Sequence, residues 1–353
     1  MSYDCGHHLH GIERGDNDSN PNAAPLIQLH AYDWCVIQDH LLRRATLVCR
    51  PAVTAQTRRD LIKRLDTQAK NMQPDFHLRS SFTSNFTPHT YRGAFERIQE
   101  YIRAGDCYQV NLAQRFIAEY QGEPWHAYRA LRSVAAAPFS AFLSQAGDNA
   151  IISLSPERFL SLHGQHVETA PIKGTRPRHK SKAKDHEARR ELRASLKDRA
   201  ENLMIVDLLR NDLGRSCVPG SIHVDRMFEV QTLATVHHLV STISGKLAPE
   251  RSAIELLRDS FPGGSITGAP KRRAMEVIAE LEPSARQVYC GSVLYISADG
   301  RMDSNIAIRT LLCREGEIQC WGGGGIVADS RWEQEYQETW DKVGPFLERL
   351  EQL

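Results

Sequence analysis

The stretch Asp106–Phe116, DCYQVNLAQRF, decides the fold class because apolar and polar side chains alternate along it. Tyr108, Val110 and Leu112 fall on one face of an extended chain, which is the period of a half-buried β-strand. The preceding segment, 91–105, carries apolar residues at helical spacing and ends at a glycine, so it predicts a helix.

Further strands follow, and the helices are grouped rather than alternating regularly with strands. This order predicts an α+β fold built on antiparallel sheets. The other predicted strands are 31–39, 43–50, 139–145, 150–155, 158–164, 165–172, 228–247, 287–297, 304–316 and 317–327, and the other predicted helices are 55–70, 181–213, 251–259, 270–282 and 330–350.

The composition excludes several classes of protein. The 353 residues carry 44 basic and 43 acidic side chains, and a net charge of +1 gives no general attraction for nucleic acid or anionic membranes. No apolar run approaches the ~18 residues of a membrane helix, and the N-terminus has no signal-peptide core. The eight cysteines show no C-x-x-C spacing, which is typical of reduced thiols. We expect a cytoplasmic protein.

Two polar segments suggest ligands but have simpler interpretations. HHLH at 7–10 has metal-binding side chains, yet no carboxylate or cysteine partner stands at a recognised metal-ligand spacing from it, so a solvated loop is favoured. The run Arg176–Arg199 holds ten basic residues against four acids but lacks interleaved aromatics, so a solvated helix face is favoured over a nucleic-acid site.

Two glycine-rich stretches resemble nucleotide motifs without completing them. WGGGGIVADS, 321–330, lacks the second strand of a dinucleotide fold, but a glycine-rich turn at a helix start offers N–H groups to an anion such as a carboxylate. FPGGSITGAPKRR, 261–273, has Ala269 where a P-loop has lysine; Thr267 and Pro270 suit a helix N-terminus instead.

Three carboxylates raise the possibility of a metal site. Glu335, Glu338 and Lys342 share one face of the last predicted helix, and Glu338 with Lys342 alone is an ordinary surface pair. If that face is buried, its carboxylates need a cation, and hard oxygen ligands suit Mg²⁺. Glu201, on an apolar helix, is a third candidate ligand.

Lys173 stands where a predicted strand runs into a turn, within ETAPIKGTRPR at 168–178. A lysine there commonly points into water. Burial would instead lower the pKa of its amine and make it a nucleophile. The residues alone leave both interpretations open.

Taken together, the motifs resemble those of the chorismate-utilising enzymes, and among them the aminodeoxychorismate synthase component I family. The resemblance runs from about Tyr32 to the C-terminus and implies a fold of large antiparallel sheets packed as a sandwich, with helices outside. Its motifs are GDCYQVNLAQRF (105–116), SLSPERFL (153–160), PIKGTRPR (171–178), KDRAENLMIVDLLRNDLG (197–214), VHHLVSTI (236–243), FPGGSITGAPK (261–271), IAIRT (306–310), GGGGIVADS (322–330) and EYQETWDK (335–342).

The resemblance also implies a site. It implies Mg²⁺ between Glu201 and Glu338, with Glu335 close by, holding the ring carboxylate of chorismate near Lys342. Arg309, Tyr295 and the backbone of Gly324 and Gly325 match the grip on the enolpyruvyl carboxylate. The other implied substrate-binding residues are Gly174, Thr175, His238 and Thr267.

Lysine in P-I-K-G-T marks the aminodeoxychorismate branch, where anthranilate synthases carry alanine. The resemblance implies that Lys173 attacks ring C2, that Glu157 protonates the departing C4 hydroxyl, and that ammonia then replaces the lysine. Water-adding relatives carry a lysine base at the position of Gln109, so glutamine implies ammonia. A glutamine amidotransferase subunit is the implied ammonia source and heterodimer partner, because the chain shows no G-x-C-x-G nucleophile loop.

The resemblance leaves two alternatives and one departure. The alternatives are anthranilate synthase component I and a catalytically weak, chorismate-binding subunit. The departure is the family's N-terminal portion, which is missing before SYDCG. We therefore expect residues 1–30 to be a polar, partly ordered remnant and residues 31–353 to form the chorismate-binding catalytic domain.

Overall fold

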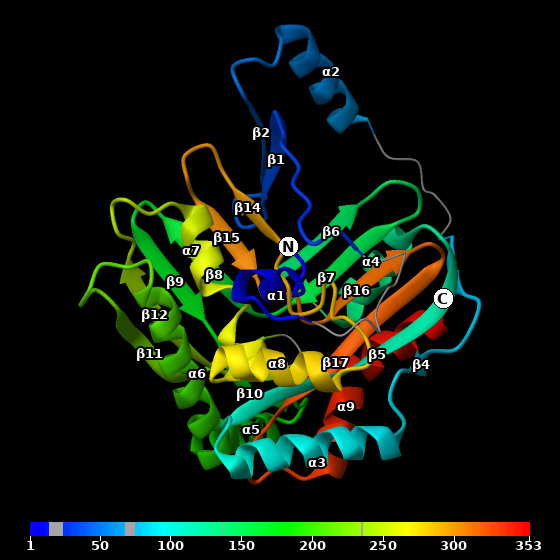
Figure 1. Cartoon of the computed structure of the whole chain (residues 1–353). Helices are drawn as coiled ribbons and strands as arrows, with labels where there is room; N and C mark the ends of the chain where they lie inside the picture. Colours follow the sequence, from blue (N-terminus) through cyan, green and yellow to red (C-terminus); the bar gives the residue numbers. More distant parts are fainter. Residues whose placement is uncertain (14–23, 68–74, 136, 234–235) are drawn as a thin grey trace. The chain divides into compact units, whose positions relative to one another are not determined.

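The computed structural model describes residues 1–13, 24–67, 75–135, 137–233 and 236–353, which form two compact units (Figure 1). The larger unit contains residues 1–26 and 75–353, and the smaller contains residues 27–74. This division differs from the predicted boundary at residue 30, because the N-terminal segment packs with the larger unit.

A seven-stranded antiparallel sheet forms one layer of the larger unit. Its order is β10-β12-β9-β8-β15-β14, with β11 paired to β12. The strands are β8 (Arg158–His163), β9 (His166–Ala170), β10 (Ile172–Pro177), β11 (His223–Thr232), β12 (Val236–Lys246), β14 (Leu294–Ile296) and β15 (Met302–Asn305).

An eight-stranded antiparallel sheet forms the other layer. Its order is β13-β5-β17-β16-β7-β6, with β3 and β4 paired to β5. The strands are β3 (Phe76–Leu78), β4 (Thr83–Ser84), β5 (Gln109–Gly122), β6 (Phe139–Ser144), β7 (Ala150–Ser155), β13 (Gly268–Ala269), β16 (Thr310–Arg314) and β17 (Glu317–Ile326).

Strand β5 confirms the alternating pattern and extends beyond it. Val110 and Leu112 are fully buried, but Gln109 on the opposite face is fully buried as well. Tyr108 precedes the strand and is exposed, contrary to its predicted place on the apolar face. Both faces of β5 are therefore covered at its start.

The core lies between the two sheets. Leu112 of β5, Phe159 of β8 and Ile243 of β12 belong to one buried apolar cluster. Burial of this size is the main favourable term in folding, and it fixes the two sheets against each other. This arrangement agrees with the predicted sandwich.

Helices surround the sheets and carry several candidate site residues. Helix α3 begins with a Thr87–Thr90 capping box and ends at Gly105, whose φ of 82° favours glycine. The predicted helix 181–213 divides at Ser195, which caps the second part. The helices are α1 (Cys5–His10), α3 (Pro88–Ala104), α4 (Pro124–Val134), α5 (Lys182–Ala194), α6 (Leu196–Gly214), α7 (Ala253–Ser260), η2 (Gly264–Ile266), α8 (Lys271–Leu281) and α9 (Trp332–Glu351).

The N-terminal segment is ordered where a polar loop was expected; residues 14–23 of that segment lie outside the described residues. Tyr3 is fully buried beneath the guanidinium of Arg286, with 4.7 Å between the guanidinium carbon and the ring centre. The predicted solvated loop at 7–10 is a helix, and His10 Nε2 lies 3.0 Å from the carbonyl oxygen of Phe261.

Three strand predictions are wrong in their extent. The predicted strand 304–316 is split between β15 and β16, and residues 306–309 belong to neither. The predicted strand 228–247 is a hairpin of β11 and β12, with Leu233 bonded to Val236 across its turn; residues 234–235 lie outside the described residues. Only residues 294–296 of the predicted strand 287–297 are extended in a sheet, because Gln287 and Cys290 adopt positive φ values.

The smaller unit is a hairpin followed by a helix, as predicted. It contains β1 (Trp34–Asp39), β2 (Arg44–Cys49) and α2 (Ala55–Asp66), which Thr54 caps. Residues 68–70, at the predicted end of this helix, lie outside the described residues.

Two further features concern the chain as a whole. All eight cysteines are free thiols, and six are buried. Among the described residues, no helix combines the length and apolar character needed to cross a membrane.

Candidate active site

Lys173, on edge strand β10, has a desolvated amine. Its Nζ donates a hydrogen bond to the carbonyl oxygen of Ser265, 3.0 Å away. Burial lowers the pKa of the amine, against the opposing attraction of Glu201 and Glu157. It forms no ion pair with the described residues. The desolvated interpretation of this lysine is therefore favoured over the solvated one.

Glu157, between β7 and β8, is the predicted general acid that would act together with this amine. It is 4% exposed, and burial raises its pKa, with smaller opposing effects from a Ser265 hydrogen bond and from Lys173. A carboxyl kept protonated near neutral pH can act as a general acid.

Gln109 presents an unsatisfied amide at the start of β5. It is fully buried, and neither its Nε2 nor its Oε1 has a hydrogen-bond partner among the described residues. The amide packs on Gly325 so closely that a Cβ there would overlap it. A buried amide without partners costs about 1–3 kcal/mol, so this one is suited to a polar ligand.

The glycine run 322–325 lies inside β17, so the prediction of a turn at a helix start is wrong. The strand continues to Ile326 and pairs with β5 throughout. Close approach favours glycine here: a Cβ on Gly322 would lie 2.5 Å from the backbone oxygen of Thr339, and one on Gly324 would lie 3.0 Å from Glu335 Oε2.

Arg309 acts electrostatically on His238, and neither side chain is paired with an anion among the described residues. Burial lowers the pKa of Arg309, whose guanidinium makes no hydrogen bond or ion pair with described side chains or backbone. His238 Nδ1 lies 2.9 Å from Thr175 Oγ1, and its Nε2 has no described partner. Burial and repulsion by Arg309 lower the pKa of His238 to about 4, so the ring is neutral at pH 7. Such an arginine is suited to a carboxylate ligand.

Two carboxylates of α9 converge on Gly324. Glu335 Oε2 and Glu338 Oε1 lie 3.0 and 3.7 Å from a Cβ built on that glycine. Burial raises the pKa of Glu335, partly offset by a 2.7 Å hydrogen bond from Ser330. Burial also acts to raise the pKa of Glu338, but its 2.6 Å contact with Lys342 outweighs this and lowers it.

Glu201 of α6 belongs to the same electrostatic group. Burial raises its pKa, and attraction to Lys173 and Lys197 opposes that rise. Repulsion by Glu338 of α9 adds to the rise in the pKa of Glu201. Within the described ranges, however, no three His, Cys, Asp or Glu side chains lie close enough to enclose a metal ion. The carboxylates thus have the oxygen donors that Mg²⁺ prefers, without being gathered around one point.

Three of the predicted substrate-binding residues contact other parts of the protein. Thr267 is fully buried, and its hydroxyl donates to the carbonyl of Gly263 at 3.2 Å; it does not cap α8, whose N-cap is Pro270. Gly174 has a φ of 78° and packs on Asp198. Lys342 also donates to the carbonyl of Gly323 at 2.8 Å.

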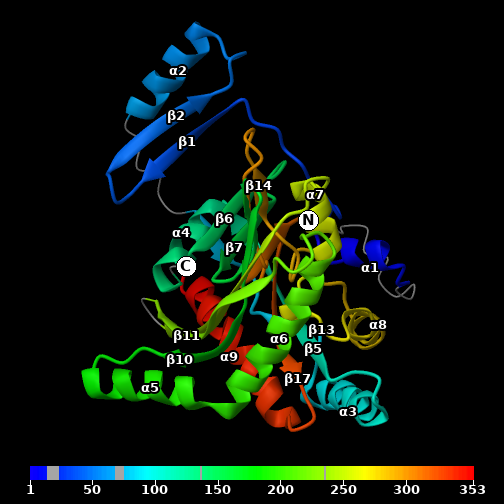
Figure 2. The same cartoon turned by 90° about the vertical axis from the view of Figure 1, so that its left-hand side faces the viewer.

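Tyr295 does not lie with the other candidates. It is 61% exposed on β14, at the opposite edge of the seven-stranded sheet from β10. Five strand spacings separate the two strands, or about 24 Å. Figures 1 and 2 both show β14 at the upper end of the unit and β10 at the lower end.

Sequence reasoning missed Ser265, which contacts both Lys173 and Glu157. Its position within the GGSITGAP stretch was a usable signal, but a small serine has no distinctive chemistry of its own.

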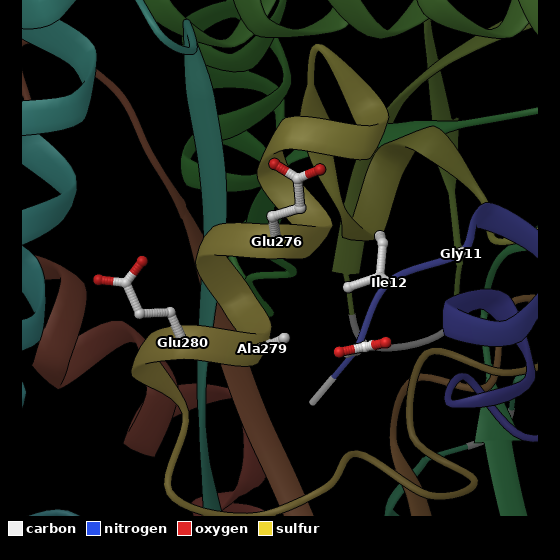
Figure 3. A pocket seen from close by; sticks show the side chains of 6 residues that line it. Gly11, Ile12, Glu276, Ala279 and Glu280 are labelled. Carbon is white, nitrogen blue, oxygen red and sulfur yellow. The ribbon is translucent and has the colours of Figure 1, made fainter. Parts of the chain in front are cut away.

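Two cavities lie away from these residues. One of about 370 Å³ is lined by Gly11, Ile12, Glu13, Glu276, Ala279 and Glu280 (Figure 3). Glu276 there is paired with Arg272 and Arg273. Another, of about 490 Å³, includes His166, His223 and Lys246. No candidate site residue lines either cavity.

Comparisons with known proteins identify the family of this chain. A model of the chorismate binding enzyme family matches residues 1–348. "Aminodeoxychorismate synthase component 1" of Escherichia coli (strain K12) is 48% identical over 352 residues, covering 99% of this chain and 76% of that protein. Its counterpart of the same name in Salmonella typhimurium is 47% identical over 351 residues, with the same coverage.

Among solved structures, anthranilate synthase component I from Streptococcus pneumoniae TIGR4 matches with a TM-score of 0.87 and 33% identity. The match covers 98% of this chain and 79% of that one. The predicted α+β fold is confirmed. The chain belongs to the family of chorismate binding enzymes.

Proposed function

We propose that this protein converts chorismate and ammonia into 4-amino-4-deoxychorismate, the precursor of para-aminobenzoate for folate. The observation that carries the proposal is the desolvated amine of Lys173, joined through Ser265 to the buried carboxyl of Glu157. The identity of 47–48% to two proteins named aminodeoxychorismate synthase component 1 supports it.

The first step forms a covalent intermediate. The neutral amine of Lys173 bonds to ring C2, the ring double bonds shift, and the C4–O bond breaks. Glu157 gives its proton to the departing hydroxyl, which leaves as water. Hydroxide is a poor leaving group, so a positioned acid contributes typically 10²–10⁴-fold. The lowered pKa of Lys173 and raised pKa of Glu157 suit these roles.

The second step releases the product. Ammonia bonds to C4, the double bonds shift back, and the bond from C2 to Lys173 breaks. The surplus proton of the added ammonia returns to Glu157, and the lysine is again a free amine. The unsatisfied amide of Gln109 is suited to accept a hydrogen bond from ammonia. Two covalent steps direct the new nitrogen to C4.

Chorismate carries two carboxylates, and the site has two regions suited to them. Arg309 and His238 would bind the enolpyruvyl carboxylate beside Gly324 and Gly325. Lys342 would lie near the ring carboxylate, with Gly174 and Thr175 beside the reacting carbons. Tyr295 has no part in this arrangement because of its exposure on β14.

Mg²⁺ would be held by Glu338, Glu335 and Glu201, and would supply positive charge to the ring carboxylate. All three are hard oxygen donors, and a cation would relieve the repulsion between them; because they are not gathered around one point, holding one ion would require them to move closer together. Calorimetric titration of the substrate-free protein with Mg²⁺ tests this role, and Glu338→Gln is expected to weaken binding.

We infer that the ammonia comes from a glutamine amidotransferase subunit. The name "component 1" of the two relatives implies a second component for those proteins. Without that subunit, ammonium salts at mildly alkaline pH should replace it.

Product analysis tests the function. The purified protein is incubated with chorismate, Mg²⁺ and ammonium, and mass spectrometry follows the products. Aminodeoxychorismate is expected, and Lys173→Ala should abolish or redirect its formation. Lys246→Ala is the matched control, because this lysine is exposed on neighbouring β12.

The structural match to an anthranilate synthase favours a second candidate function, ring amination with pyruvate loss. Anthranilate from the unmutated protein would establish that function and reject ours. Chorismate binding without any product would instead identify a non-catalytic subunit.

A further inference from the structure

Ser265 touches both reacting side chains. It lies in η2, is 6% exposed, and accepts the 3.0 Å hydrogen bond from Lys173 Nζ at its carbonyl oxygen. Its side chain lies beside the carboxyl of Glu157 and acts to lower the pKa of that carboxyl.

The turn that carries Ser265 is held from several directions. Arg286, fully buried and paired with Glu282 at 2.7 Å, donates to the carbonyl of Ile266 at 2.9 Å. Gly264 packs on α6, where a Cβ would lie 2.7 Å from Leu208 Cγ. Ser265 therefore sits on a support that leaves it little freedom to move.

The two contacts of Ser265 orient the two reacting groups. A carbonyl accepts one N–H of the amine and, unlike a carboxylate, does not hold the amine in its charged form. The lone pair of neutral Lys173 then points away from that carbonyl. The serine hydroxyl has a single proton, so it donates to one oxygen of Glu157 and leaves the other to carry the acid proton.

We propose that Ser265 is a positioning residue that fixes the amine of Lys173 relative to the carboxyl of Glu157. One bound orientation of chorismate then meets the nucleophile at C2 and the acid at the C4 hydroxyl. This inference rests on the proposed function and names a residue that serves it without reacting. Positioning of this kind matters because displacement by about 1 Å can cost 10²-fold in rate.

The pH dependence gives a signature that a merely structural serine lacks. The titratable groups that act on Glu157 include Lys173, Lys342 and Cys290, whose thiol stays neutral because burial raises its pKa to about 12. Removing the hydroxyl removes a hydrogen bond that lowers the pKa of Glu157, so that pKa should rise. Because Glu157 acts in its protonated form, the alkaline limb of kcat/KM should move to higher pH.

The kinetic test compares three variants. Ser265→Ala is expected to lower kcat roughly ten- to hundredfold, the loss of one strong hydrogen bond, with KM for chorismate within about twofold. Ser265→Thr keeps the hydroxyl and should restore most of kcat. Ser292→Ala is the matched control, a buried serine whose hydroxyl has no partner among the described residues. It should behave as the unmutated protein.

Infrared spectroscopy of the substrate-free protein separates this inference from the function. The stretch of the protonated Glu157 carboxyl, assigned by its loss in Glu157→Gln, should rise in frequency in Ser265→Ala because a hydrogen bond is lost. That readout holds whichever product the enzyme forms, whereas product identity tests the function alone.

Two results would overturn the inference. One is a Ser265→Ala variant with the kcat, alkaline limb and carboxyl stretch of Ser292→Ala. The other is a raised KM with an unmoved alkaline limb, which would mean that the hydroxyl contacts substrate instead of Glu157.

Discussion

Replacing Arg309 by methionine should stabilise the ligand-free protein and weaken its binding of chorismate. The guanidinium is desolvated and has no partner anion among the described residues. Methionine has a similar length without the charge. Arg309 also has a φ of 49°, but this backbone cost is the same for methionine, so it does not affect the comparison.

The magnitudes follow from these contacts. A bidentate arginine–carboxylate pair makes two charge-assisted hydrogen bonds, and its loss should cost about 3–4 kcal/mol, or 10²–10³-fold in the Kd for chorismate. Removing an unpaired, desolvated charge should stabilise the free fold by about 1 kcal/mol, the low end because the side chain keeps some exposure. For a chain of this size that raises Tm by roughly 1–2 °C.

Calorimetry measures both effects. Scanning calorimetry without ligand gives the change in Tm, and titration with chorismate and Mg²⁺ gives the Kd. Arg301→Met is the control, since this arginine is exposed and paired with Asp299. A variant that is less stable than the unmutated protein and still binds chorismate normally would refute the reasoning.

Three further changes test the site and its frame. The pKa of His238 is about 4 in the folded chain and ~6.5 in the unfolded chain, so the unfolded chain binds a proton first as pH falls. The free energy of unfolding should therefore drop by roughly 3 kcal/mol between pH 6.5 and 4. In His238→Gln, the free energy of unfolding measured by urea titration should depend less on pH over this range. Lys271→Met leaves buried Asp212 without its 2.7 Å partner and should destabilise by about 3–5 kcal/mol in urea, whereas Lys271→Met with Asp212→Leu should recover most of that loss; no recovery would contradict an isolated ion pair. Gly325→Ala displaces the Gln109 amide and should raise KM for ammonium roughly tenfold, the loss of one hydrogen bond, while an unchanged KM would remove Gln109 from ammonia binding.

The sequence was sufficient for features that local pattern controls. Alternation identified β5. The turn predicted after Lys173 is wrong, because β10 continues to Pro177; Gly174, with a φ of 78°, lies at a shift in its register with β12. The desolvation of Lys173 was not readable in the same way. Its partner Ser265 lies 92 residues away in the chain, so only the folded arrangement brings them together.

The wrong strand predictions have local causes that composition hides. The turn between β11 and β12 contains no glycine, proline, asparagine or aspartate, so LATV reads as continuous strand. Segment 287–293 is apolar enough for a strand, but Gln287 and Cys290 have positive φ values. Neither residue type favours a positive φ, so the sequence does not predict this break.

The glycine run 322–325 gave the opposite error, because a turn was predicted where the structure has a strand. Glycines commonly mark turns, but here they keep β17 extended while Glu335 and the Gln109 amide approach its backbone. What the sequence could not supply was the identity of the neighbours, which come from α9 and β5.

Intact-protein mass spectrometry tests the central claim most directly. The protein is mixed with chorismate and Mg²⁺, without ammonium, and quenched before its mass is measured. We predict an added mass equal to chorismate less one water, located on Lys173 by peptide mapping and absent from Lys173→Ala. An unmodified protein that nevertheless forms aminodeoxychorismate when ammonium is present would contradict the covalent role of this lysine.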